Sequence, residues 1–125
     1  MATILVVDDE LTTLNLCENI LRMGGYEVLK ASGGQEAFTV LQGNTADLVL
    51  LDVIMPGMNG IEVAKRIQSM TPSTKIVLMT GYGPHEIARV AGSNNPYRII
   101  WKPFKAESLL RMIENVLEEA ASTSA

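Results

Sequence analysis

Short apolar runs recur along the chain, and they alternate with longer segments in which apolar residues return every three or four positions. Runs that are apolar throughout are typical of strands covered on both faces, whereas the three-to-four spacing is typical of amphipathic helices. The runs predict strands near residues 3–8, 26–31, 47–52, 75–79 and 97–102. The segments between and after them predict helices near residues 10–23, 33–42, 60–69, 84–91 and 104–120.

The helical segments carry apolar stripes that we expect to pack against a sheet. In the first segment, Leu14, Cys17 and Leu21 share one face, and Gly24-Gly25 supplies the glycine that commonly ends a helix. The stripes of the second, third and fifth segments consist of Ala37, Leu41, Ile61, Ala64, Ile67, Leu109, Ile113, Val116 and Leu117. The fourth segment, at 84–91, is short and has the weakest pattern.

Strands and helices that alternate throughout a chain predict an α/β fold. Right-handed crossovers and helices on both faces favour a doubly wound, five-stranded parallel sheet that is flavodoxin-like, with strand order 2-1-3-4-5. The strand near 26–31 alternates more than the others, and we expect it at an edge. We expect one domain over residues 1–120, and residues 121–125 as a C-terminal tail or the start of a linker.

Composition narrows the class of protein. With 47% hydrophobic residues among 125, the chain is too apolar for disorder and long enough to bury a core. No apolar stretch approaches the roughly 18 residues of a membrane span, so we expect none. The net charge is −4 and no basic run appears, so we expect no direct binding of nucleic acid. The single cysteine, Cys17, excludes an internal disulfide and favours a cytoplasmic location.

Four polar motifs follow predicted strands at the point where each strand ends. They are Asp8-Asp9, Asp52, Thr80-Gly81 and Lys102-Pro103. The C-terminal ends of parallel strands lie along one edge of a sheet, where ligand sites form, so we expect these side chains to converge. Three carboxylates, a hydroxyl and an ammonium suit a divalent cation together with a phosphoryl group.

Each motif also has a simpler interpretation. Asp8 or Asp9 could cap the first helix, and Asp52 could cap a helix or a turn. Thr80 has a high strand propensity, and an isolated lysine such as Lys102 is usually solvated. The combination is more specific than any single residue, because each type stands at a strand end where this chemistry needs it.

In the segments that contain these motifs, the chain resembles the receiver domain of two-component response regulators. The matching segments are 4–10 (ILVVDDE), 50–60 (LLDVIMPGMNG), 79–81 (MTG) and 101–104 (WKPF). The resemblance implies the same fold and a role as a signalling phosphoacceptor, which catalyses its own phosphorylation and dephosphorylation instead of turning over a separate substrate. The implied partner is a cognate histidine kinase or phosphotransfer protein, whose phosphohistidine supplies the phosphoryl group.

The resemblance also implies roles for individual residues. Asp52 is the implied phosphoacceptor, and Thr80 and Lys102 are implied to contact the phosphoryl group. Asp9 is implied to ligate Mg²⁺ (or Mn²⁺) directly, and Asp8 mostly through water. The remaining ligands implied for the metal are Asp52 and the backbone carbonyl of Ile54.

One position departs from the common family pattern, and two others stand where the family varies. Ile99 stands three residues before Lys102, where the family often has Tyr or Phe, so an aromatic rotamer switch at that position is excluded. Ile54 and Tyr82 occupy two positions that tune the lifetime of the phosphoryl group. Both are large and neither is acidic, and we hypothesise that they hinder the attacking water and slow autodephosphorylation.

Two alternative functions use similar residues. A phosphatase of the haloacid dehalogenase type needs an acidic residue two positions after its nucleophile, where this chain has Ile54. A flavodoxin-like cofactor binder needs a first loop that holds phosphate, which Asp8-Asp9-Glu10 would repel. The downstream target and a phosphorylation-dependent dimer stay open, as does the choice between a standalone regulator and part of a longer one.

Overall fold

The computed structural model describes residues 1–81 and 97–123 of the chain. All five predicted strands are present, as β1 (Thr3–Val7), β2 (Glu27–Ala31), β3 (Leu48–Asp52), β6 (Lys75–Thr80) and β7 (Arg98–Trp101). They form one sheet in the order β2-β1-β3-β6-β7, and every neighbouring pair is parallel. Counted in chain order, these strands have the order 2-1-3-4-5, so the predicted topology and the edge position of β2 are confirmed.

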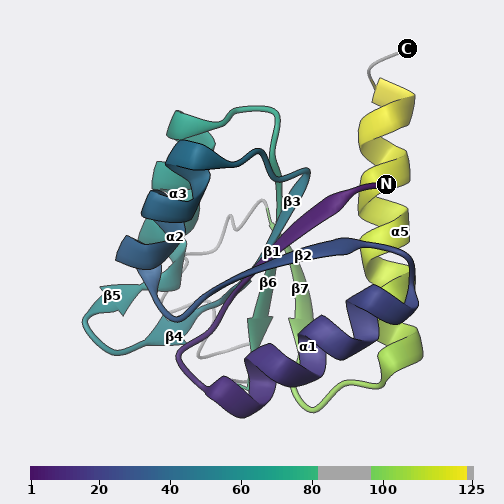
Figure 1. The fold of residues 1–125 in the computed structure, drawn as a ribbon, viewed down its shortest axis with the longest axis horizontal. Helices are drawn as coiled ribbons and strands as arrows, with labels where there is room; N and C mark the ends of the chain where they lie inside the picture. The colour runs from purple at the N-terminus through teal and green to yellow at the C-terminus, as the bar shows by residue number, and fades with distance from the viewer. Residues whose placement is uncertain (82–96, 124–125) are drawn as a thin grey trace.

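The described helices are α1 (Leu11–Met23), α2 (Gly34–Gly43), α3 (Gly60–Met70) and α5 (Ala106–Thr123). Figure 1 shows α2 and α3 on one face of the sheet and α1 and α5 on the other. The helix predicted near 84–91 lies outside the described residues, as does Tyr82. No helix in the described part of the chain is long and apolar enough to cross a lipid bilayer.

The sheet separates two apolar cores. Both contain strand side chains, because successive side chains of a strand point to opposite faces of the sheet. Along β1, Leu5 and Val7 are buried with the residues of α2 and α3, while Ile4 and Val6 are buried with those of α1 and α5. Almost all residues of the predicted helix stripes are buried in these cores; Leu117 is only partly buried. Burial on both faces explains why the strands are apolar throughout.

Helix α1 ends in the glycine pair that was expected to stop it. The amide of Tyr26 donates to the carbonyl of Leu21, and the amide of Gly25 donates to that of Arg22. Gly25 has a φ of 90°, a conformation that glycine adopts without steric cost. These two bonds form a Schellman motif, which satisfies carbonyls that the helix end would leave unpaired.

Two features differ from the prediction. Helix α5 begins at Ala106 and runs to Thr123, later at both ends than the predicted 104–120. The loop after β3 contains a small antiparallel hairpin, β4 (Ile54–Met55) with β5 (Met58–Asn59), which the strand pattern did not predict. Its turn is Pro56-Gly57, and Gly57 has a φ of 78°. Proline followed by a glycine with positive φ is the signature of a type II turn, so a signal for this hairpin was present.

Candidate functional site

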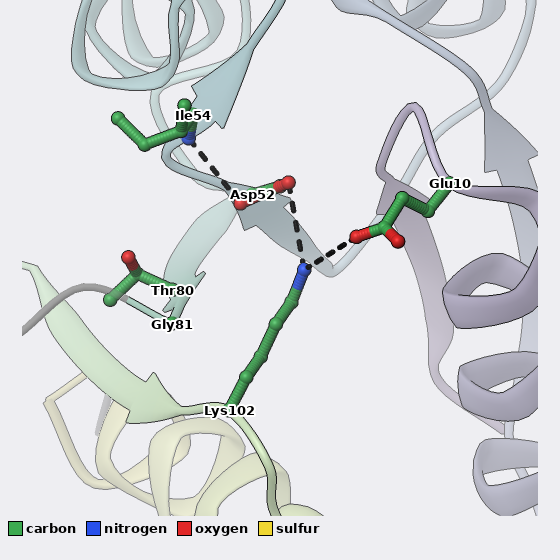
Figure 2. A pocket seen from close by; sticks show the side chains of 6 residues that line it. All are labelled: Glu10, Asp52, Ile54, Thr80, Gly81 and Lys102. Atoms are coloured by element: carbon green, nitrogen blue, oxygen red, sulfur yellow. Dashed lines mark hydrogen bonds and ion pairs between the residues drawn. The ribbon is translucent and has the colours of Figure 1, made fainter.

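The C-terminal ends of β1, β3, β6 and β7 bring the predicted site residues to one edge of the sheet. A pocket of about 310 Å³ opens there, lined by Glu10, Asp52, Ile54, Thr80, Gly81 and Lys102. Figure 2 shows Asp52 between Thr80 on one side and Glu10 on the other, with Lys102 reaching toward it from below. The strand ends therefore converge as the sequence predicted.

Three carboxylates form a cluster beside this pocket. Asp8, Asp9 and Asp52 each offer an oxygen, and these oxygens lie within 4.8 Å of one another. Asp8 is fully buried and Asp52 is 6% exposed, whereas Asp9 faces solvent. Carboxylate oxygens are the ligands that Mg²⁺ prefers, and a cation would relieve the repulsion among them. The donor set therefore fits a divalent cation.

Lys102 is the cation that faces these carboxylates. Its Nζ donates a hydrogen bond of 2.9 Å to Asp8 Oδ2, and it lies 3.6 Å from Asp52 Oδ2 and 3.9 Å from Glu10 Oε1. Burial alone would lower the pKa of Lys102, but the hydrogen bond to Asp8 and the charges of Asp52 and Asp8 raise it above its usual value. Lys102 is thus a partly buried, charged member of the site.

Asp52 lies at the end of a central strand in surroundings that disfavour its charge. Burial, and next the nearby charge of Asp8, raise the pKa of Asp52 to about 6, although Lys102 opposes this shift. The amide of Ile54 donates to Asp52 Oδ1 at 3.3 Å. The other carboxylate oxygen, Oδ2, is the one that faces Lys102 in Figure 2.

The capping interpretation of the aspartates holds only in part. The N-cap of α1 is Glu10, whose side chain makes no capping hydrogen bond, so neither Asp8 nor Asp9 caps that helix. Asp8 Oδ1 does accept a hydrogen bond from the amide of Glu10 at 2.9 Å, which fixes the turn before α1. One oxygen of Asp8 thus holds the turn, while the other receives the bond from Lys102.

The segment after Asp52 is held in place by two residues to which sequence reasoning gave no role in the site. Asn59 caps α3, because its Oδ1 accepts a hydrogen bond from the amide of Ile61 at 2.8 Å. The amide of Gly60 donates to the carbonyl of Val53 at 2.8 Å. A Cβ at Gly60 would lie 2.5 Å from the backbone oxygen of Asp52, so only glycine fits. The Asn-Gly dipeptide was the available signal.

The remaining predicted residues occupy distinct places. Thr80 is buried and lines the pocket, and its carbonyl accepts a hydrogen bond from the amide of Lys102 at 2.7 Å. Ile54 also lines the pocket, and it is 37% exposed. Ile99 of β7 is partly buried against the core on the α2 and α3 side of the sheet. Tyr97, which precedes β7, packs against the same core, and its hydroxyl donates to Gln68 of α3.

Comparison with known proteins shows the family to which the chain is related. The family model described as the response regulator receiver domain matches residues 4–114. The transcriptional regulatory protein ZraR of Escherichia coli (strain K12) is 33% identical over 122 residues, which are 98% of this chain and 28% of that protein. The sporulation initiation phosphotransferase F of Bacillus subtilis (strain 168) is 29% identical over 114 residues, covering 91% of this chain and 92% of that one.

Solved structures agree as well. A CheY-like response regulator receiver domain protein from Methanospirillum hungatei JF-1 superposes with a TM-score of 0.89 at 28% identity, and 98% of each chain is covered. The chemotaxis protein CheY4 of Vibrio cholerae superposes with a TM-score of 0.84 at 30% identity, covering 93% of this chain and 98% of that one. The chain therefore belongs to the response regulator receiver domain family.

Proposed function

We propose that Asp52 accepts a phosphoryl group from the phosphohistidine of a histidine kinase or phosphotransfer protein and forms an acyl phosphate. One observation carries this proposal: Asp52 ends a central strand, beside two further aspartates and 3.6 Å from the Lys102 ammonium. In the transfer, an oxygen of Asp52 forms a bond to phosphorus as the P–N bond breaks, and the imidazole leaves with the bonding electron pair.

Asp8, Asp9, Asp52 and the backbone carbonyl of Ile54 would hold Mg²⁺ or Mn²⁺ in this proposal. The cation, when bound, offsets negative charge on the carboxylates and on the phosphoryl oxygens. Support comes from the clustering of the three carboxylates and from the raised pKa of Asp52 in its buried position near Asp8. Both indicate a site that is short of positive charge.

Lys102 and Thr80 would bind the oxygens of the transferred group. The ammonium of Lys102 already lies between Asp8 and Asp52, so a small movement would let it pair with a phosphoryl oxygen on Asp52. The hydroxyl of Thr80 would donate to another oxygen from the opposite side of the pocket (Figure 2). Together they would hold the group in place as charges and donors that are already oriented.

The two alternatives from the sequence find no such support. Ile54 stands where a haloacid dehalogenase phosphatase needs an acid, and the cluster of Asp8, Asp9 and Asp52 would repel the phosphate of a flavin. The family model of the response regulator receiver domain matches residues 4–114. We therefore propose a signalling phosphoacceptor and not an enzyme with a turnover substrate.

We also propose that the domain receives phosphoryl groups in the cytoplasm and binds no nucleic acid itself. The free Cys17 and the net charge of −4 fit this location and this absence of nucleic-acid binding. ZraR, of which the chain spans 28%, is named a transcriptional regulator, whereas the phosphotransferase F, of which it spans 92%, is named a phosphotransferase. Phosphorylation would change which protein the domain binds, including a second copy of itself.

Intact-mass measurement tests the proposal. Incubation of the wild-type domain with acetyl phosphate and Mg²⁺ should add one phosphoryl group, and the addition should be absent with EDTA and in Asp52→Asn. Addition that persists in Asp52→Asn would place the acceptor elsewhere. A wild type that stays unmodified with acetyl phosphate and with a phosphohistidine donor would contradict the proposal as a whole.

A further inference from the structure

Glu10 lines the pocket at Asp52, yet none of the roles above needs it. Its carboxylate lies at the rim opposite Thr80, and Oε1 is 3.9 Å from the Nζ of Lys102 (Figure 2). The side chain is 65% exposed, so it meets both the solvent and whatever enters the pocket. Glu10 therefore belongs to the entrance of the site and not to its buried cluster.

The fold fixes the backbone of Glu10 but makes little use of its carboxylate. The amide of Glu10 donates to Asp8 Oδ1 at 2.9 Å, and its carbonyl accepts a hydrogen bond from the amide of Leu14 at 3.1 Å. Glu10 is the N-cap residue of α1, but its side chain makes no capping hydrogen bond. Removal of its charge should thus leave the helix and the aspartate cluster in place.

The charge around the pocket is unbalanced. Among the described residues that line the pocket, Lys102 is the only cation, and its ammonium also pairs with the buried Asp8. With Asp8, Asp9, Asp52 and Glu10 ionised, four negative charges face this single positive charge. A divalent cation would neutralise two of them. A phosphodonor that approaches across the rim would still pass the carboxylate of Glu10.

Phosphodonors differ in the charge that they bring to this rim. Acetyl phosphate approaches as a dianion, its P–O bond to the acyl group breaks, and acetate leaves with the electron pair. Phosphoimidazole carries a proton on its ring at neutral pH, its P–N bond breaks, and neutral imidazole leaves. In both reactions an oxygen of Asp52 forms the new bond to phosphorus. A carboxylate at the rim repels the first donor more strongly than the second.

We propose that Glu10 is a specificity-determining residue, whose rim carboxylate disfavours small, strongly anionic phosphodonors relative to donors that carry the phosphoryl group on a protonated imidazole, such as phosphohistidine. This inference rests on the proposed function of Asp52. It assigns Glu10 no part in bond formation. The expected effect is modest, roughly threefold in rate, because an exposed charge acts through water and is screened by salt.

The test uses two donors and one matched control. Phosphorylation rates of the wild type and of Glu10→Gln are measured by intact mass with acetyl phosphate and with monophosphoimidazole, at saturating Mg²⁺ and at low and high salt. Glu118→Gln is the control, because it removes an exposed carboxylate near the opposite end of α5. The C-terminal end of α5 lies away from the C-terminal ends of the strands in Figure 1, so this change should not affect either donor.

In Glu10→Gln, the rate with acetyl phosphate should rise about threefold relative to the rate with monophosphoimidazole, and high salt should abolish the difference. Equal changes with both donors would overturn the inference, because they would indicate an effect through Lys102. Unchanged rates, or the same shift in Glu118→Gln, would overturn it too. A wild type that neither donor phosphorylates would instead reject the proposed function, and this inference with it.

Discussion

The ammonium of Lys102 donates a hydrogen bond of 2.9 Å to the carboxylate of Asp8, which lies 94 positions away in the chain. The two residues come from strand ends that are separated in the sheet by β3 and β6, so only the folded topology brings them together. Asp8 is fully buried, and the Lys102 side chain is 21% exposed. Removal of one partner from such a pair leaves a buried charge uncompensated.

Lys102→Met should therefore lower the free energy of unfolding of the metal-free protein by about 2 kcal/mol, less than a fully buried pair would lose. It should also tighten binding of Mg²⁺, because the ammonium no longer competes for the carboxylates of Asp8 and Asp52. Urea denaturation in EDTA and calorimetric titration with Mg²⁺ measure the two effects. Lys65→Met, at an exposed position of α3, is the control. Unchanged stability in Lys102→Met would contradict the structural role of this pair.

Asp52→Asn should change stability in a way that depends on pH. Burial and the charge of Asp8 raise the pKa of Asp52 to about 6, above the ordinary value near 3.9. The stabilisation from the protonated form is thus complete below pH 4 and is lost as the pH rises through 6. In EDTA at pH 7.5, the asparagine variant should be the more stable protein, by up to about 3 kcal/mol.

Denaturation curves at pH 4 and 7.5 check this expectation. The advantage of Asp52→Asn should disappear at pH 4, where the wild-type carboxyl is protonated, and should shrink when Mg²⁺ is added at pH 7.5. Glu118→Gln controls for the loss of one exposed carboxylate. A difference that is equal at both pH values would show that the charge of Asp52 is not what strains the metal-free fold.

Gly60→Ala should destabilise the fold at the backbone that carries Asp52. The new Cβ would lie 2.5 Å from the Asp52 carbonyl oxygen and 2.6 Å from the Val53 Cα, and backbone atoms cannot step aside as a side chain can. Overpacking of this kind costs about 1–3 kcal/mol. Gly43→Ala, where a Cβ meets nothing within 4 Å, should be neutral or stabilising by less than about 1 kcal/mol.

The midpoints of urea denaturation compare the two glycine variants. A second readout separates a local effect on the site from general destabilisation. Gly60→Ala should weaken Mg²⁺ binding, whereas Val116→Ala, which opens space in the core under α5, should lower stability and leave that binding intact. Equal Mg²⁺ affinity in both variants would mean that Gly60 supports the fold without shaping the site.

The sheet and the site at its edge were predictable because both follow from local patterns. Apolar runs specify strands that are buried on both faces, and the rule that parallel strands end along one edge then places Asp8, Asp52, Thr80 and Lys102 together. The terminal glycines of α1 were predictable for the same reason, since Gly25 alone supplies the positive φ there. Each of these inferences needs only a short stretch of sequence.

The unpredicted features depend on distances between segments. The Asn59-Gly60 pair signals a turn, but the fit of Gly60 against the Asp52 backbone is set by how closely α3 approaches β3. The position of Glu10 at the pocket rim depends on the turn that Asp8 holds and on the reach of Lys102. The β4–β5 hairpin has only two residues in each strand, too few for an alternation to stand out.

The Cys17 thiol can report local opening of helix α1. It is fully buried, and burial, followed by the charge of Asp8, raises the pKa of its thiol to about 11. Since the thiolate is the reactive form, iodoacetamide at pH 8 should modify the folded protein far more slowly than the urea-unfolded chain.

Bound Mg²⁺ should slow the reaction further if opening of α1 disrupts the Asp8–Asp9 loop that precedes it. Intact mass against time measures both rates, with Cys17→Ala as the blank. Alkylation of the folded protein at the unfolded rate would contradict the burial of this thiol.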